Sequence, residues 1–232
     1  MISQKKSSLL SRIFSGKSNQ KEGLDNRLSE MLNIVEKMYS TVMDAIISET
    51  AEKEEIQDRV KAWDRQLGEL EEAVRRDILL NISKSGSVEA GISRKITMLA
   101  LVKDCERMGD YIKNIFRVFI TKQKVFLDDY KPSFIEQREW TEQAFPKLKS
   151  ALTDDDLAMA QTICQQAHEM SKKAGHVVDT LIKLPRSSET PVASSLMFLF
   201  HKRLLRHMFN VGSSIVMPYQ KVNYFDEGKF SN

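Results

Sequence analysis

The chain has 232 residues, with 35 lysines and arginines against 32 aspartates and glutamates, so its net charge is only +3. This balance produces no strong field of one sign and does not support binding to nucleic acid. Glycine and proline are few, at 9 and 5 residues, and the composition favours helices arranged in one large or two small domains.

The cysteines and the hydropathy of the chain predict the cellular location of the protein. Cys105 and Cys164 both fall in helical patterns without CxxC or zinc-type spacing, which predicts two buried thiols in a reducing cytosol. No run of about 18 apolar residues predicts a membrane span. We therefore expect a cytoplasmic protein.

Residues 1–22 form a basic tail without the apolar core of a signal peptide. Leucine, isoleucine and phenylalanine recur in this tail at helical spacing beside lysines and arginines. Two interpretations stay open: the tail lies on an anionic lipid surface and holds the protein at the membrane periphery, or it is simply mobile.

Apolar stripes predict the next two helices. The first helix begins after Gly23, with Asp25 or Asn26 as its cap, and the second follows a break at 48–50. Their stripes repeat in steps of three and four, as in helical bundles: Leu28, Leu32, Val35, Tyr39, Val42 and Ile46, then Ile56, Val60, Trp63, Leu67, Leu70, Val74 and Ile78. Because their connection is short, we expect these helices to be antiparallel neighbours.

The second helix also carries acids beside its apolar stripe. Asp64, Gly68 and Glu71 lie along one line, each about a turn from the next, with the glycine between the two carboxylates. A turn-rich loop at 84–90 then leads into a third helix.

The third helix, at 96–119, combines an apolar stripe with a second pair of acids. Glu106 and Asp110 are four residues apart, so their like charges lie one above the other at the edge of the stripe and repel. Gly109 lies between them, although glycine costs a helix about 1 kcal/mol relative to alanine. The pattern indicates that a cation offsets the repulsion and that another backbone or a ligand comes close to the glycine.

The segment DCERMGDYIKNI resembles the signature of the phosphate-uptake regulator (PhoU) family, commonly written LERIGDxxxNI. The matching residues are Glu106, Arg107, Gly109, Asp110, Asn114 and Ile115. The stretch WDRQLGELEEAV is similar to the helix-two pattern of the family, DxxINxLExxI, with Asp64 and Glu71 at the acid positions and Gly68 in place of the usual asparagine. The resemblance implies an all-α fold of two tandem three-helix bundles, six long helices in total.

The four acids would face each other if the second and third helices pack along their stripes. Carboxylate oxygens without cysteine or histidine suit a hard cation such as Mg, Mn, Ca or Fe better than zinc. The resemblance implies iron or another oxygen-preferring divalent cation (Mn, Mg or Zn), with the predicted ligands Asp64, Glu71, Glu106 and Asp110. Asp104 lies roughly 200° around the helix from Glu106 and is not in this set. The alternative is a solvated face on which the acids pair with Arg65, Arg75, Lys103 and Arg107.

The second half repeats this plan after a connector at 123–133. A fourth helix runs from near Phe134 to Leu152 with Pro146 inside it, and Asp154 to Asp156 cap a fifth helix. A linker at 183–192 precedes a sixth helix from about Ala193 to Val216. The predicted bundles are therefore residues 23–122 and 134–217, followed by a tail at 218–232 that docks on the bundle or frays.

The chemistry of the first half is not repeated in the second. Aligning the signature about 99 residues later places Leu205 where Glu106 stands and Phe209 where Asp110 stands. The histidines of the second half, His168, His176, His201 and His207, share no ligand spacing, and we assign no role to them.

No enzyme motif is present, and we expect a regulatory protein without catalytic residues. The resemblance implies an accessory protein that modulates phosphate transport or phosphate-starvation signalling through protein contacts, often as a homodimer. Its implied partners are a phosphate transporter, either an ABC ATPase subunit or a Na/phosphate carrier, and a sensor kinase. The alternative from another class is a metal-free helical scaffold, at the membrane periphery if residues 1–22 bind lipid.

Overall fold

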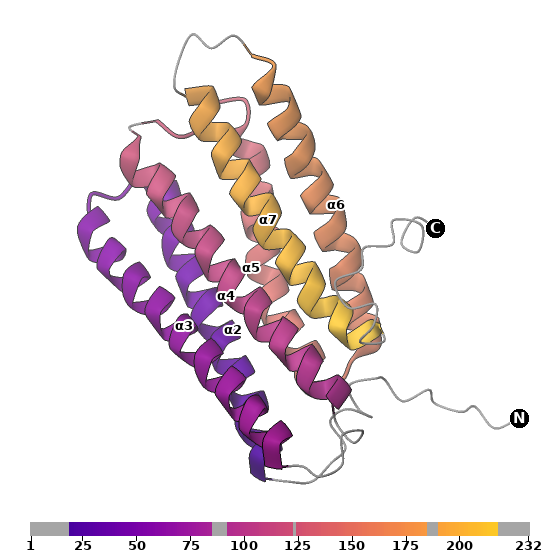
Figure 1. Ribbon diagram of the computed structural model, residues 1–232. Helices are drawn as coiled ribbons and strands as arrows, with labels where there is room; N and C mark the ends of the chain where they lie inside the picture. The colour runs from indigo at the N-terminus through magenta and orange to yellow at the C-terminus, as the bar shows by residue number, and fades with distance from the viewer. Residues whose placement is uncertain (1–18, 85–91, 123, 185–189, 218–232) are drawn as a thin grey trace, which may run out of the picture.

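Six long α-helices and no strand make up the part of the chain that the computed structural model describes, residues 19–84, 92–122, 124–184 and 190–217. The helices are α2 (Asn19–Ile47), α3 (Lys53–Lys84), α4 (Ile92–Thr121), α5 (Lys131–Asp154), α6 (Leu157–Ile182) and α7 (Thr190–Val216). The predicted all-α fold of two tandem three-helix bundles is confirmed (Figure 1). None of the described helices is long and apolar enough to cross a membrane.

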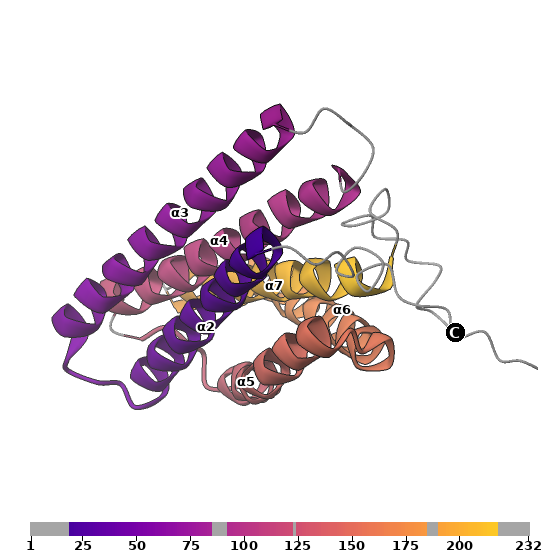
Figure 2. The ribbon, with the colours of Figure 1, turned by 90° about the horizontal axis from the view of Figure 1, so that it is seen from below.

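The two bundles lie side by side along their length. Helices α2, α3 and α4 pack together, and so do α5, α6 and α7. The third helix of each bundle faces the other bundle, so α4 packs against α7, and α2 lies beside α5 (Figures 1 and 2). Helices α4 and α7 therefore form the centre of the molecule.

Four helices begin earlier than the sequence predicted, among them α4, which begins at Ile92 rather than at 96. Helix α2 begins at Asn19 rather than after Gly23, because the surrounding helix-forming residues outweigh one glycine. Helix α5 begins at Lys131 rather than near Phe134, with Pro132 in its first turn, where no backbone N–H is needed. Helix α7 likewise begins at Thr190, just before Pro191. Of the predicted tail 1–22, residues 19–22 belong to α2 and residues 1–18 lie outside the described residues. The tail 218–232, residues 85–90 of the first loop and residues 185–189 of the linker at 183–192 also lie outside them.

Local signals set the turns between helices. Asp156 caps α6, as predicted, because its carboxylate accepts a hydrogen bond of 3.0 Å from the backbone N–H of Met159. Asp155 before it and Glu49 after α2 both have positive φ, which reverses the chain sharply at these points. Helix α5 runs on through Pro146 without ending.

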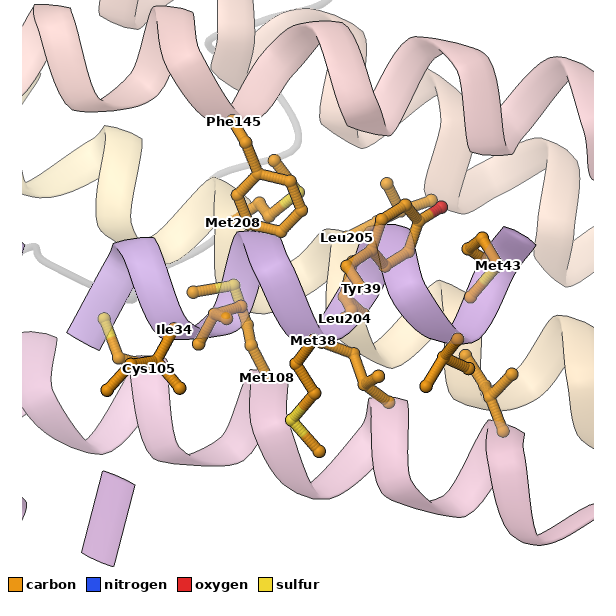
Figure 3. Close-up of a cluster of buried hydrophobic side chains, with 14 of the residues drawn as sticks. Ile34, Met38, Tyr39, Met43, Cys105, Met108, Phe145, Leu204, Leu205 and Met208 are labelled. Carbon is orange, nitrogen blue, oxygen red and sulfur yellow. The ribbon is translucent and has the colours of Figure 1, made fainter. Parts of the chain in front are cut away.

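One main cluster of buried side chains extends across both bundles. Figure 3 shows part of it, where Met38 and Tyr39 of α2 lie close to Met108 of α4, Phe145 of α5 and Met208 of α7. Because the two halves share this core, the division of the chain into domains at 23–122 and 134–217 stays a prediction from the sequence repeat. Cys105 and Cys164 are buried free thiols, and burial raises the pKa of both.

A buried histidine joins the two bundles by hydrogen bonds. His201 of α7 is fully buried and its Nδ1 donates to Gln137 Oε1 of α5 at 3.2 Å, so Nε2 is left to accept from the Tyr39 hydroxyl of α2 at 2.8 Å. Burial lowers the pKa of His201 to about 3. The imidazole is therefore neutral in the folded protein at any pH at which the protein is expected to work.

The His201→Gln variant is expected to lose part of the acid sensitivity of folding. In the unfolded chain this histidine has the ordinary pKa of 6.5 and binds a proton below that pH, whereas in the folded chain it stays unprotonated down to about pH 3. The free energy of unfolding therefore falls as the pH is lowered from 6.5 towards 3. One such proton contributes about 1.4 kcal/mol per pH unit. Urea unfolding at a series of pH values between these limits measures the slope.

The control for this prediction is His176→Gln, since His176 is exposed on α6. It should leave the slope as in the wild type. If the unfolding free energy depended on pH with the same slope in the wild type and both variants, His201 would take up a proton in the folded state as well, and the prediction would be wrong.

Candidate functional site

The four acids predicted as ligands lie along the line of contact between α3 and α4, which we call the acidic seam (Asp64, Glu71, Glu106 and Asp110). The helices run antiparallel, so Asp64 lies near Asp110 and Glu71 lies near Glu106, with lysines between them. Gly109 allows the close approach. A Cβ at this position would lie 2.4 Å from Leu67 Cδ1 of α3. The close neighbour of this glycine is therefore a leucine side chain, and not the backbone or ligand that the sequence predicted.

Lys113 joins the first pair of carboxylates. Its Nζ donates to Asp64 Oδ1 at 2.6 Å and lies 3.0 Å from Asp110 Oδ1. Arg107 Nη1 donates to the other oxygen of Asp110 at 3.1 Å. Burial alone would lower the pKa of Lys113, but its hydrogen bonds to both aspartates and their charges outweigh burial and leave that pKa raised. Lys113 is thus held in its charged form.

Lys103 joins the second pair. Its Nζ lies 2.8 Å from Glu106 Oε2 and 3.5 Å from Glu71 Oε2. The short contact to Glu106 is an ion pair whose direction is not that of a hydrogen bond, and this buried oxygen accepts none. On the other side, Arg75 pairs with Glu71 Oε1 at 2.6 Å. Each carboxylate pair therefore has one lysine between its members and one arginine beside it.

The charges of the seam balance within the protein. Four carboxylates are matched by the four cations Arg75, Lys103, Arg107 and Lys113. Three of these were expected as ion-pair partners. Lys113 takes the place that sequence reasoning gave to Arg65, which is exposed. Helix spacing alone could have suggested Lys113, because it lies three residues after Asp110.

The fit of the seam to a metal ion follows from the same contacts. A hard cation takes six or more oxygen ligands at about 2.0–2.6 Å. Among the residues that the structure describes, no three acidic, histidine or cysteine side chains gather in a group that could hold a metal. The seam offers two carboxylates at each of two points, and an ammonium already lies at both. As placed, these residues fit ammonium ions better than a metal cluster, and metal binding by them stays a prediction.

A second polar cluster lies on the other side of α4, where sequence reasoning placed no function. Asp104 is buried, and its Oδ1 accepts hydrogen bonds from His207 Nδ1 at 2.7 Å and from Asn210 Nδ2 at 2.9 Å, both on α7. Tyr111 stacks on the His207 ring with centroids 5.5 Å apart. This cluster ties the two bundles together, and Asp104 does not join the seam. An aspartate inside an apolar stripe was the signal that could have revealed it.

The first bundle is similar to a known protein domain. A family model described as the PhoU domain matches residues 28–118, which extend from the start of the α2 stripe into the last turn of α4 and include the whole acidic seam. No curated protein gives a significant match to the chain.

The two glycines of the seam are expected to respond in opposite ways to alanine. A Cβ at Gly68 would meet nothing within 4 Å, so Gly68→Ala should stabilise the protein by about 1 kcal/mol through helix propensity. At Gly109 the new methyl would collide with Leu67, which is buried against its neighbours, and overpacking of this kind costs about 1–3 kcal/mol. Urea unfolding of both variants measures the two changes. A Gly109→Ala protein at least as stable as the wild type would contradict the tight packing.

Proposed function

Because this chain is a PhoU-family protein, with its PhoU domain at residues 28–118, we propose that it is a non-enzymatic regulator of phosphate homeostasis. In this proposal it modulates phosphate transport or phosphate-starvation signalling by binding other proteins. The family match carries the proposal, since the matched residues contain both helices of the acidic seam.

The chemistry of the seam supports a binding role rather than catalysis. A general base or a nucleophile needs a carboxylate or amine that is free to react. Each seam carboxylate instead has a lysine or an arginine within ion-pairing distance. Such a surface offers alternating charges at fixed positions, which gives specificity and orientation to a protein contact.

The proposed partners are those of phosphate uptake: an ABC ATPase subunit or a Na/phosphate carrier, and in signalling a sensor kinase. Arg75 and Arg107 are the exposed seam cations, and Arg107 contacts two seam acids, Asp110 and Glu106. We propose that the α3–α4 face around Arg107 is the contact surface, and that the protein acts as a homodimer.

The function is tested in cells that lack the gene. Uptake of radiolabelled phosphate and a phosphate-starvation reporter are measured with phosphate in excess. We expect at least one of them to rise in the deletion strain and to return to normal with the wild-type gene, because the regulator restrains its partner when phosphate is plentiful. Wild-type values for both, with and without phosphate, would contradict the role.

The contact surface is tested with Arg107→Glu. This variant should fail to restore regulation and should retain less of the partner in a pull-down with the purified ATPase subunit, carrier or kinase, because it places an acid beside the acids of the seam. The matched control is Arg117→Glu, which changes an exposed arginine further along the same helix. Equal loss for both variants would point to a general effect of charge rather than to this surface.

A further inference from the structure

The order of charges along α4 forms a single line. Lys103, Glu106, Asp110 and Lys113 follow at steps of three, four and three residues, so they share one face of the helix, with the two acids inside and a lysine at each end. Across from this line, Asp64 and Glu71 of α3 are seven residues apart and reach the two lysines. Each ammonium therefore has a carboxylate from each helix as its neighbour.

Four carboxylates along one helix contact need positive charge close by, because unpaired acids that are partly withdrawn from water destabilise the folded state. A bound metal would supply that charge only when the metal is present. The two lysines supply it whenever the chain folds, since Lys113 lies 2.6 Å from Asp64 and Lys103 lies 2.8 Å from Glu106. They also join α3 to α4, as a bridging metal would.

An ammonium and a metal ion would compete for the same oxygens. The Asp64 oxygen that accepts from Lys113, and the Glu106 oxygen beside Lys103, could bind a cation only after the lysine had moved away. Gly68, between Asp64 and Glu71 on α3, is exposed and nothing lies within 4 Å of a Cβ built there, so water and small ions can approach the seam at this point.

We propose that Lys103 and Lys113 are built-in counter-ions that close the acidic seam without a metal, and that removing them uncovers a site for a divalent cation with oxygen ligands. In this chain the ammonium groups do the structural work that the family resemblance assigns to a metal. This role of the two lysines does not depend on the phosphate role or on the identity of the partner.

The test uses the full chain without a histidine tag, as the wild type, Lys113→Met and Lys103→Met/Lys113→Met. Methionine keeps the length of the side chain and removes its charge. The control is Lys61→Met, since Lys61 lies on α3, exposed, and pairs only with Asp58 among the described residues. Thermal unfolding is followed with EDTA, with MnCl2 and with neither, and elemental analysis gives the metal content of each protein as purified.

For the wild type and the Lys61 control we expect no stoichiometric metal and the same unfolding midpoint with EDTA and with MnCl2. The double variant should unfold at a temperature lower by roughly 2–4 °C or more. Mn2+ should raise that midpoint and EDTA should reverse the effect, because ligand binding to the folded state stabilises it. The single Lys113 variant should show the same response, more weakly. It provides the test if the double variant does not fold.

Two results would overturn the proposal. In the first, the wild type carries a stoichiometric metal that is lost in Glu106→Ala/Asp110→Ala, which would establish the metal site implied by the resemblance instead. In the second, the lysine variants keep the wild-type midpoint or show no response to Mn2+, which would mean that the lysines are ordinary surface residues.

Discussion

Packing of α4 against α7 is the constraint on which the rest of this structure depends. Each of these helices is the third of its bundle and touches two partners in its own half as well as the other helix of the pair. On α4 only Ile96, Arg107, Arg117 and the terminal Thr121 are exposed among the residues whose burial is described. A helix enclosed on so many sides can keep acids only where they are neutralised. The acids of α4 accordingly pair at the α3 edge or, in the case of Asp104, with donors from α7.

The same constraint explains why the second half lacks the acidic motif. Helices α6 and α7 contact each other along more of their length than α3 and α4 do, and a Cβ at Gly212 would lie 2.9 Å from Cys164 Sγ. Leu205 and Phe209, at the positions that correspond to Glu106 and Asp110, are buried. Acids there would be withdrawn from water, whereas on α3 the residue between the seam acids Asp64 and Glu71, Gly68, is exposed. The two bundles thus share a plan but differ in how tightly their last two helices pack.

Much of the fold could be predicted because it depends on periodicity. Steps of three and four residues identified the six helices, and the one-turn spacing of Glu106 and Asp110 placed them on the edge that meets α3. Periodicity does not give the rotation and the shift of one helix relative to another. For that reason the bridging role of Lys113, the pairing of Asp104 with His207 and the buried position of His201 could be read only from the structure.

Methionine is prominent where the bundles meet, with Met38 on α2, Met108 on α4 and Met208 on α7 in one buried group (Figure 3). Its unbranched thioether side chain adapts to irregular spaces, so a contact built from it tolerates small sliding of one bundle past the other better than one built from branched residues. The same chemistry makes the contact vulnerable. Conversion of these sulfur atoms to sulfoxides would place polar groups between the two bundles and would favour their separation.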